Sequence, residues 1–235
     1  MHYSGLVLWR GAVEAEAFLD GRTMFMAGHD QQKAVVYPIR NPLAPGGSAL
    51  VNWVAERPVN LDVTTADWNT PVDPADIAPW FEDWDFGWIH VGDLIASSET
   101  AYEFPMVDRS PLDRWSHGRV TLLGDAAHPM RPNGSNGASQ GILDAEALTR
   151  ALDGEPDSVA ALVSYEAERR EATGRLVLAN RQAGPERVMQ WVKDRCEGSC
   201  MDRHTCVDAH DLEREANAYK ELAGFDIARL QAMTD

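Results

Sequence analysis

The residues best suited to chemistry form a strand–loop–helix pattern in the middle of the chain. Val120–Leu123 is a short apolar run that predicts a buried strand, and it is followed by an acid, Asp125. The next segment, His128–Gly137, holds two prolines, two glycines and two asparagines, which are typical of a loop with unusual φ angles. Over Ala138–Leu152 apolar residues recur at helical spacing, which predicts a helix that ends near Gly154.

This pattern is suited to binding an anionic or polar ligand. The first turn of a helix leaves backbone N–H groups unpaired, and the helix dipole adds partial positive charge there. The carboxylate of Asp125 is suited to a hydroxyl group of a sugar or a ribityl chain. An ordinary strand–loop–helix, in which loop amides bind Asp125, explains the same residues. Spacing alone leaves both interpretations open.

The stretch resembles the second FAD-binding motif of class A flavoprotein monooxygenases, the para-hydroxybenzoate hydroxylase-like family. In that family a Gly-Asp pair contacts the ribityl chain, and the following loop and helix start face the pyrimidine side of the isoalloxazine. The segments Gly134–Gln140 and Ile142–Ala145 most resemble the branch that contains phenazine and salicylate hydroxylases. The resemblance implies these cofactor-binding residues: Gly124, Asp125, Ala126, Pro132, Gly134, Ser135, Asn136, Gly137 and Ala138.

The resemblance also implies a reaction. In the family NAD(P)H reduces FAD, O2 adds at the flavin C4a atom, and the resulting hydroperoxide hydroxylates a small aromatic substrate. The amides of Asn136 and Gly137 would face N1 and O2 of the ring and stabilise the negative charge that develops there. The expected cofactor is FAD and the expected reductant is NAD(P)H. The catalytic residues stay unknown, because no general base is assigned.

A pocket for the aromatic substrate is implied as well. Its expected lining residues are Trp9, Tyr37, Trp53, Pro105, Met106, His128 and Pro129. Judged without the resemblance, aromatic residues on strands more often belong to the core than to a ligand site. His128 lies in a loop stiffened by prolines, so a structural role is an equal alternative to a hydrogen bond with a substrate phenolate.

The elements before the motif predict a mostly antiparallel sheet. Strands are expected at 3–11, 23–27, 33–39, 49–55 and 101–107, with a short helix or turn at 12–19 and a helix at 74–84. After the motif, helices are expected at 157–178, 183–193 and 212–222. The predicted fold class is α/β (α+β). It comprises a substrate-binding sheet domain (1–110), an FAD-binding segment (111–182) and a C-terminal helical tail (183–235).

Two family signatures are not found in the sequence. One is the Gly-x-Gly-x-x-Gly turn that holds the ADP half of FAD. The other is an Asp-Gly pair that contacts the pyrophosphate and NAD(P)H, and the pairs Asp20-Gly21 and Asp153-Gly154 lie in the wrong contexts for it. We therefore expect the chain to be catalytically incomplete as given. The alternative is a remnant that binds a small molecule or a protein as a scaffold. The substrate and the choice between NADH and NADPH stay open.

Charge and hydropathy restrict the partners. A net charge of −16 argues against nucleic acid and against an anionic membrane surface. No apolar run approaches the ~20 residues that span a bilayer, and a signal peptide is not recognised at the start, so a cytoplasmic location is expected. The expected partners are a small aromatic substrate and O2. A second copy of the chain, or a missing N-terminal half, remains open.

Three cysteines lie close together near two histidines. Cys196, Cys200 and Cys206, with His204 and His210, suggest a zinc site, because thiolate and imidazole are preferred zinc ligands. The spacings Cys-x3-Cys and Cys-x3-His do not match the usual paired ligands. We therefore predict free thiols and no metal.

Overall fold

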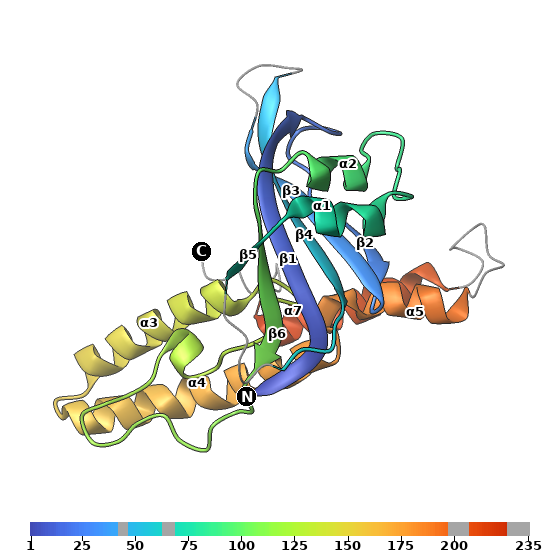
Figure 1. The fold of residues 1–235 in the computed structure, drawn as a ribbon. Helices are drawn as coiled ribbons and strands as arrows, with labels where there is room; N and C mark the ends of the chain where they lie inside the picture. The colour runs from blue at the N-terminus through green and yellow to red at the C-terminus, as the bar shows by residue number, and fades with distance from the viewer. Residues whose placement is uncertain (42–46, 63–68, 197–206, 225–235) are drawn as a thin grey trace. The chain divides into compact units, whose positions relative to one another are not determined.

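The structure, a computed structural model, describes residues 1–41, 47–62, 69–196 and 207–224 (Figure 1). The chain divides into two compact units. The sheet unit is Gly5–Met106, and the helical unit is Met1–Ser4 together with Val107–Asp235. None of the helices within the described ranges is long and apolar enough to span a bilayer.

A six-stranded sheet organises the sheet unit, with the order β2-β3-β4-β1-β6-β5. Its strands are β1 (His2–Glu16), β2 (Phe25–His29), β3 (Gln32–Arg40), β4 (Ser48–Pro58), β5 (Thr70–Val72) and β6 (Ala101–Asp108). The pairs β1–β4, β2–β3, β3–β4 and β5–β6 are antiparallel. The predicted antiparallel sheet is confirmed. The β-branched and aromatic residues of β3 and β4 suit such a pleated, half-buried surface.

Short helices cover one face of this sheet. They are α1 (Pro74–Ile77), the 3-10 turn η1 (Ala78–Phe81) and α2 (Val91–Ala96). Trp9 of β1 packs against Trp80 with ring centroids 4.9 Å apart, and Trp53 of β4 donates from Nε1 to Ser98 Oγ at 2.7 Å. The expected single helix at 74–84 is divided into α1 and the 3-10 turn η1. Pro79 lacks the N–H that a continuous α-helix requires.

The prediction of a short helix or turn at 12–19 was wrong over its first part. β1 continues to Glu16, and its residues stay in register with β4 from Gly11↔Trp53 to Glu16↔Ser48. Alanine and glutamate favour helices in isolation. Here pairing with β4 determines the conformation of residues 12–16, because hydrogen bonding to a neighbouring strand outweighs a weak helix propensity.

The helical unit is built on a pair of long helices. Its elements are η2 (Gly124–Ala126), α3 (Gly137–Gly154), α4 (Ser158–Arg181), η3 (Gly184–Glu186), α5 (Arg187–Arg195) and α7 (Ala209–Ala223). α3 and α4 enclose a small core of Trp115, Ala127, Ala147 and Tyr165. These helices lie where the periodicity predicted them. Asp157 caps the start of α4, where its side chain accepts a hydrogen bond from Val159 N.

The expected buried strand Val120–Leu123 is also corrected. Val120 is 66% exposed, and the only pairing found for it within the described ranges is an isolated bridge to His117. Leu123 keeps extended angles (φ −147°, ψ 147°). Beyond this bridge the segment has no partner strand among the described residues, so it does not form the predicted strand. On α3 the apolar Ile142 is likewise 70% exposed.

Gly11 limits the packing of a fully buried tryptophan, Trp53. A Cβ added at Gly11 would lie 2.7 Å from Cζ2 of Trp53, which is fully buried. We predict that Gly11→Ala lowers the free energy of unfolding by about 1–3 kcal/mol, measured by urea titration of tryptophan fluorescence. In a Trp53→Phe background the same change should cost much less, because the smaller ring leaves room. An equal cost in both backgrounds would contradict this packing argument.

Candidate functional site

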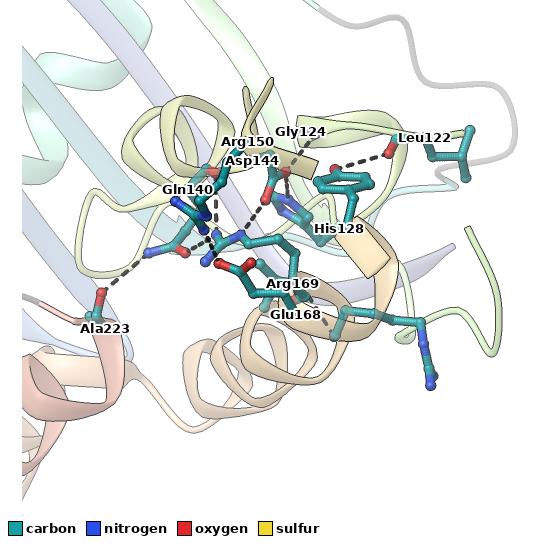
Figure 2. A network of polar contacts seen from close by, with 12 residues as sticks. Leu122, Gly124, His128, Gln140, Asp144, Arg150, Glu168, Arg169 and Ala223 are labelled. Carbon is teal, nitrogen blue, oxygen red and sulfur yellow. Dashed lines mark hydrogen bonds and ion pairs between the residues drawn. The ribbon is translucent and has the colours of Figure 1, made fainter. Parts of the chain in front are cut away.

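A buried carboxylate, Asp144 of α3, is the centre of a hydrogen-bond network around the Gly-Asp turn (Figure 2). It accepts hydrogen bonds from His128 Nε2 at 2.6 Å, Arg169 Nε at 2.7 Å and Gly124 N at 3.0 Å. The side chain of Asp144 has no exposed surface. One carboxylate therefore fastens the turn η2, the following loop and helix α4 to helix α3.

The charge state of Asp144 follows from opposing effects. Burial raises the pKa of its carboxyl group, but hydrogen bonds from His128, Arg169 and Gly124 outweigh burial and leave the pKa below its usual value. Arg169 also donates to Gln140 Oε1 at 2.7 Å, and Gln140 donates to the carbonyl of Ala223 at 3.2 Å. The buried charges are thus paired and hydrogen-bonded, as burial requires.

His128 is part of this network rather than of an open surface. Its ring is buried, its Nε2 is committed to Asp144, and its centroid lies 5.5 Å from that of Trp115. No partner for Nδ1 is found within the described part of the chain. A proton on Nε2 fits these contacts, since it donates to the carboxylate. The contacts support the structural alternative for His128.

The start of α3 is open to a ligand. Asn136 stands at the N-cap with helical angles and makes no capping hydrogen bond, so the amides of the first turn are not occupied by a side chain. The carboxylate of Asp125 is exposed, and its Oδ1 lies 3.9 Å from where a Cβ on Gly137 would be. No hydrogen-bond partner for Asp125 is found among the described residues. The backbone N–H donors at the start of α3 and the Asp125 carboxylate therefore lie next to the same space.

These groups fit the flavin end of FAD. The amides suit the carbonyl oxygen and nitrogen of the pyrimidine ring, and the Asp125 carboxylate suits a ribityl hydroxyl. The glycines at 124 and 134 have φ angles of 58° and 78°, which glycine adopts without strain. Ser135 has a φ of 54°, an uncommon conformation for a residue with a side chain. Such strained residues persist where the surroundings hold them.

Side chains anchor this loop at several points. Arg131 forms an ion pair with the buried Asp108 (Nε to Oδ2, 3.0 Å), which Arg181 also binds through Nη2 at 2.6 Å. Asn133 Nδ2 donates to Glu186 Oε2 at 2.7 Å. The loop is thus fixed to the end of β6 and to the segment after α4.

Tyr219 of α7 supplies a further anchor. Its hydroxyl accepts from Asn136 Nδ2 at 2.7 Å and donates to Asn180 Oδ1 at 2.7 Å. Its ring fills the space beside Gly134, where an added Cβ would lie 2.4 Å from the hydroxyl oxygen. Burial raises the pKa of Tyr219, so the hydroxyl stays protonated as this donor role requires. The C-terminal helix thereby holds the helix start in place.

The predicted cofactor residues lie in one turn, loop and helix start, and the predicted substrate residues are divided between the two units. Trp9 and Trp53 are buried beneath the helices of the sheet unit. Tyr37 pairs with Asn52 on β4, so it lies on the opposite face of the sheet, half-buried. Pro105 and Met106 are buried in the same unit. His128 and Pro129 belong to the helical unit.

Sequence reasoning missed Asp144, Gln140 and Tyr219 as supports of the site. Asp144 recurs at helical spacing with Ala147, Leu148 and Ala151, and an acid on this apolar face was the available signal. Arg169 forms an ion pair with Asp144, which gives it a structural role. Tyr219 carries no local signal, because its partners are distant in sequence.

Only part of the cysteine cluster can be placed. Cys196 is a free, half-buried thiol, while Cys200, His204 and Cys206 lie outside the described residues. His210 is exposed in the first turn of α7.

Comparison with known proteins agrees with this geometry. Residues 29–180 match the model of the FAD binding domain family. The chain is 49% identical over 177 residues to a phenazine 1,6-dicarboxylic acid hydroxylase from Lysobacter antibioticus, covering 74% of this chain and 44% of the relative. It is 42% identical over 85 residues to a 6-hydroxynicotinate 3-monooxygenase from Bordetella bronchiseptica, covering 35% of this chain and 22% of that relative.

Solved structures share the fold. HpxO from Klebsiella pneumoniae complexed with FAD has a TM-score of 0.60 at 24% identity, covering 97% of this chain and 52% of HpxO. A salicylate hydroxylase substrate complex has a TM-score of 0.61 at 22% identity, and the match covers 94% of this chain and 57% of the salicylate hydroxylase chain. The family match and the named relatives support membership of the class A flavoprotein monooxygenases, and the solved structures show the same fold. The chain belongs to the FAD binding domain family, and it spans about half the length of the relatives it matches.

The buried carboxylate gives a first test of the site. Asp144→Asn should lower the free energy of unfolding by about 3–5 kcal/mol, because it leaves Arg169 buried without a countercharge. The folded-state pKa of Asp144 is lowered, so its stabilising contribution is present above the unfolded pKa of about 3.9 and is lost as the pH falls through the folded value. The difference between wild type and variant should therefore shrink below about pH 4.

Urea titrations at pH 7 and in acid measure this difference. The matched control is Asp153→Asn, which removes an exposed carboxylate at the end of the same helix and should change little. A loss of stability that is independent of pH would contradict the ionic role of Asp144.

The Tyr219 hydroxyl gives a second test. Tyr219→Phe keeps the ring but leaves two buried partners unsatisfied, so we expect a loss of about 1–3 kcal/mol and faster hydrogen exchange of the amides at 133–137. Tyr102→Phe, which removes an exposed hydroxyl, serves as the control. Unchanged exchange in the loop would show that the hydroxyl does not hold it.

Proposed function

We propose that the chain is the substrate-side and flavin-side part of an FAD-dependent monooxygenase that hydroxylates a small aromatic compound. The observation that carries this proposal is the uncapped start of α3 beside the exposed Asp125 carboxylate. A structural loop would occupy these groups with its own side chains. Here donors and acceptor stay free for a ligand.

The residues have separate roles in this proposal. FAD, reduced by NAD(P)H, supplies the activation of O2 and the hydroxylation. The Asp125 carboxylate accepts a hydrogen bond from a ribityl hydroxyl. The amides of Asn136 and Gly137 donate to the pyrimidine edge and stabilise negative charge there. Pro129 and Pro132 limit the motion of the loop, which helps to keep water away.

The names of the relatives suggest the substrate class. They act on a phenazine dicarboxylic acid, on 6-hydroxynicotinate and on 3-amino-4-hydroxybenzoate. All three are planar aromatic acids. We propose a compound of this kind as the substrate of the whole protein.

A remnant without a working flavin site is the second candidate. The chain covers 44% of the length of the phenazine relative. An upstream reading frame that encodes Gly-x-Gly-x-x-Gly would support the monooxygenase, because this turn binds the pyrophosphate of FAD. The visible spectrum of a purified protein that includes the upstream sequence distinguishes the two candidates. Flavin absorption supports the monooxygenase, and absence of flavin absorption supports the remnant.

We predict that Asp125→Ala in the upstream-extended protein weakens FAD binding by about 1.5–3 kcal/mol, through the loss of a charge-assisted hydrogen bond. Titration of the apoprotein with FAD, followed by flavin fluorescence, gives the dissociation constant. Asp153→Ala makes the same charge change at the far end of α3 and should leave it unchanged. If both variants bind FAD as the wild type does, Asp125 is not a ligand.

The 235-residue chain itself provides a contrast. We expect it to bind FAD weakly, because the contacts to the ADP half are absent from it, and to self-associate through exposed apolar residues such as Val120 and Ile142. A yellow, monomeric 235-residue protein would contradict this expectation.

A further inference from the structure

An aromatic patch lies within the sheet unit, where the turn after β1, the start of β2 and the loop between η1 and α2 meet (Figure 1). It consists of four rings, which belong to Phe18, Phe25, Phe86 and Trp88. The centroid of the Trp88 ring lies 4.9 Å from that of Phe25, 5.6 Å from that of Phe18 and 5.8 Å from that of Phe86. One tryptophan thus joins three separate segments into a single cluster.

Part of this patch is open to solvent. Phe86 and Trp88 are 39% and 40% exposed. Leu19 and Met24, which follow and precede the two other rings in sequence, are 57% and 55% exposed. Apolar residues that are exposed singly are ordinary, whereas a group of them on adjoining segments marks an interaction surface. The aromatic patch and its two aliphatic neighbours form such a group.

The backbone holds the two exposed rings in place. Gly87, which separates them, has a φ of 75°, and its N–H donates to Asp85 Oδ1 at 2.7 Å. Phe86 N donates to the carbonyl of Ile89 at 3.0 Å, which closes the loop. Aromatic side chains on a fixed backbone lose little conformational entropy on binding, which favours their use in recognition.

The loop that carries these rings is negatively charged. Glu82, Asp83 and Asp85 are exposed, and no Lys or Arg occurs between residues 58 and 108. No side-chain hydrogen bond or ion pair of Glu82 or Asp83 is found within the described ranges. The aromatic patch is therefore bordered by carboxylates that can pair with a cation.

A guanidinium group fits both features. It stacks on aromatic faces, to which cations are attracted, and its N–H groups pair with carboxylates. The sheet unit already contains such a contact, because the Arg57 guanidinium lies 4.6 Å from the centroid of the Trp80 ring. Among the described residues no Lys or Arg lies over the ring of Phe86 or Trp88.

Other partners fit this charge pattern less well. The net charge of −16 repels a second copy of the chain and any anionic surface. Arg22 is the only Lys or Arg between residues 11 and 32, and Asp20 carries the opposite charge two residues earlier. The surroundings of the aromatic patch thus favour a cationic partner.

We propose that the aromatic patch binds an arginine-bearing segment of a partner protein. A guanidinium of that segment stacks on Trp88 or Phe86 and pairs with the carboxylates of the same loop. Apolar side chains beside it pack against Leu19 and Met24. This interaction goes beyond the proposed hydroxylation, because it involves neither FAD nor an aromatic substrate.

Three labelled hexapeptides are suitable probes: Leu-Arg-Gly-Leu-Arg-Gly and the same peptide with Lys or Glu in place of Arg. Fluorescence anisotropy with the upstream-extended protein should show saturable binding of the Arg peptide at about 1 mM or below. Binding of the Lys peptide should be about threefold or more weaker, and the Glu peptide should not bind. Salt should weaken binding of the Arg peptide, and FAD should leave it unchanged.

Variants test the rings and the charges separately. Trp88→Ala should weaken binding of the Arg peptide about threefold to tenfold, because it removes the ring that joins the patch. Tyr102→Ala removes an exposed ring outside the patch and should have no effect.

Glu82→Gln combined with Asp83→Asn should weaken binding of the Arg peptide and reduce its salt dependence. Asp153→Asn combined with Glu155→Gln makes the same charge change at the exposed end of α3 and should not. Circular dichroism verifies that each variant is folded, and the charge variant decides if Trp88→Ala is not.

The proposal is overturned by any of four results. The Arg peptide does not bind saturably, or the Glu peptide binds as tightly, or Trp88→Ala and the charge variant both bind the Arg peptide with unchanged affinity. The fourth is sedimentation in which Trp88→Ala converts a dimer of the protein into a monomer, because a second copy then occupies the patch.

Discussion

The ion pair between Asp144 and Arg169 is the constraint on which the rest of the helical unit depends. A carboxylate without exposed surface is tolerated only with full compensation, and three donors from three segments provide it. The backbone donor Gly124 N belongs to the turn that presents Asp125. A buried charge in one helix thereby sets the position of an exposed charge in a loop. Figure 2 shows how the same network continues through Gln140 to the carbonyl of Ala223.

The loop between the turn and α3 combines strain with anchorage. Ser135 holds a left-handed φ, and the helix start has no side-chain cap. Both features are unfavourable by themselves. They persist because Arg131, Asn133 and Asn136 are tied to Asp108, Glu186 and Tyr219 respectively. A loop with free donors and little freedom of its own suits the recognition of a rigid ring.

Much of this arrangement follows from local pattern in the sequence. The alternation in β3 and β4 and the periodicity of α3 and α4 predicted these elements, and the Gly/Asn-rich loop predicted the open helix start. Features decided by distant partners were not predictable. Ala12–Glu16 favours a helix locally but pairs with β4. Val120–Leu123 has strand composition, but among the described residues its only backbone pairing is the isolated bridge from Val120 to His117. Trp9 and Trp53 were expected in a pocket, yet the helices that cover them were not fully foreseen. The supporting role of Tyr219 depends on residues 83 and 39 positions away, at Asn136 and Asn180, which no local pattern records.

The contact between α7 and the helix start has a thermodynamic consequence. Tyr219 and the Ala223 carbonyl bind Asn136 and Gln140, so docking of the C-terminal helix and ordering of the ligand-binding turn share one free energy. Two equilibria linked in this way influence each other by the same factor in both directions. A ligand that orders the turn therefore strengthens the docking of α7. A cut before α7 lowers the affinity for that ligand by the same free energy. The chain end and the cofactor turn behave as one cooperative element, although more than eighty residues separate Asn136 from Tyr219 along the sequence.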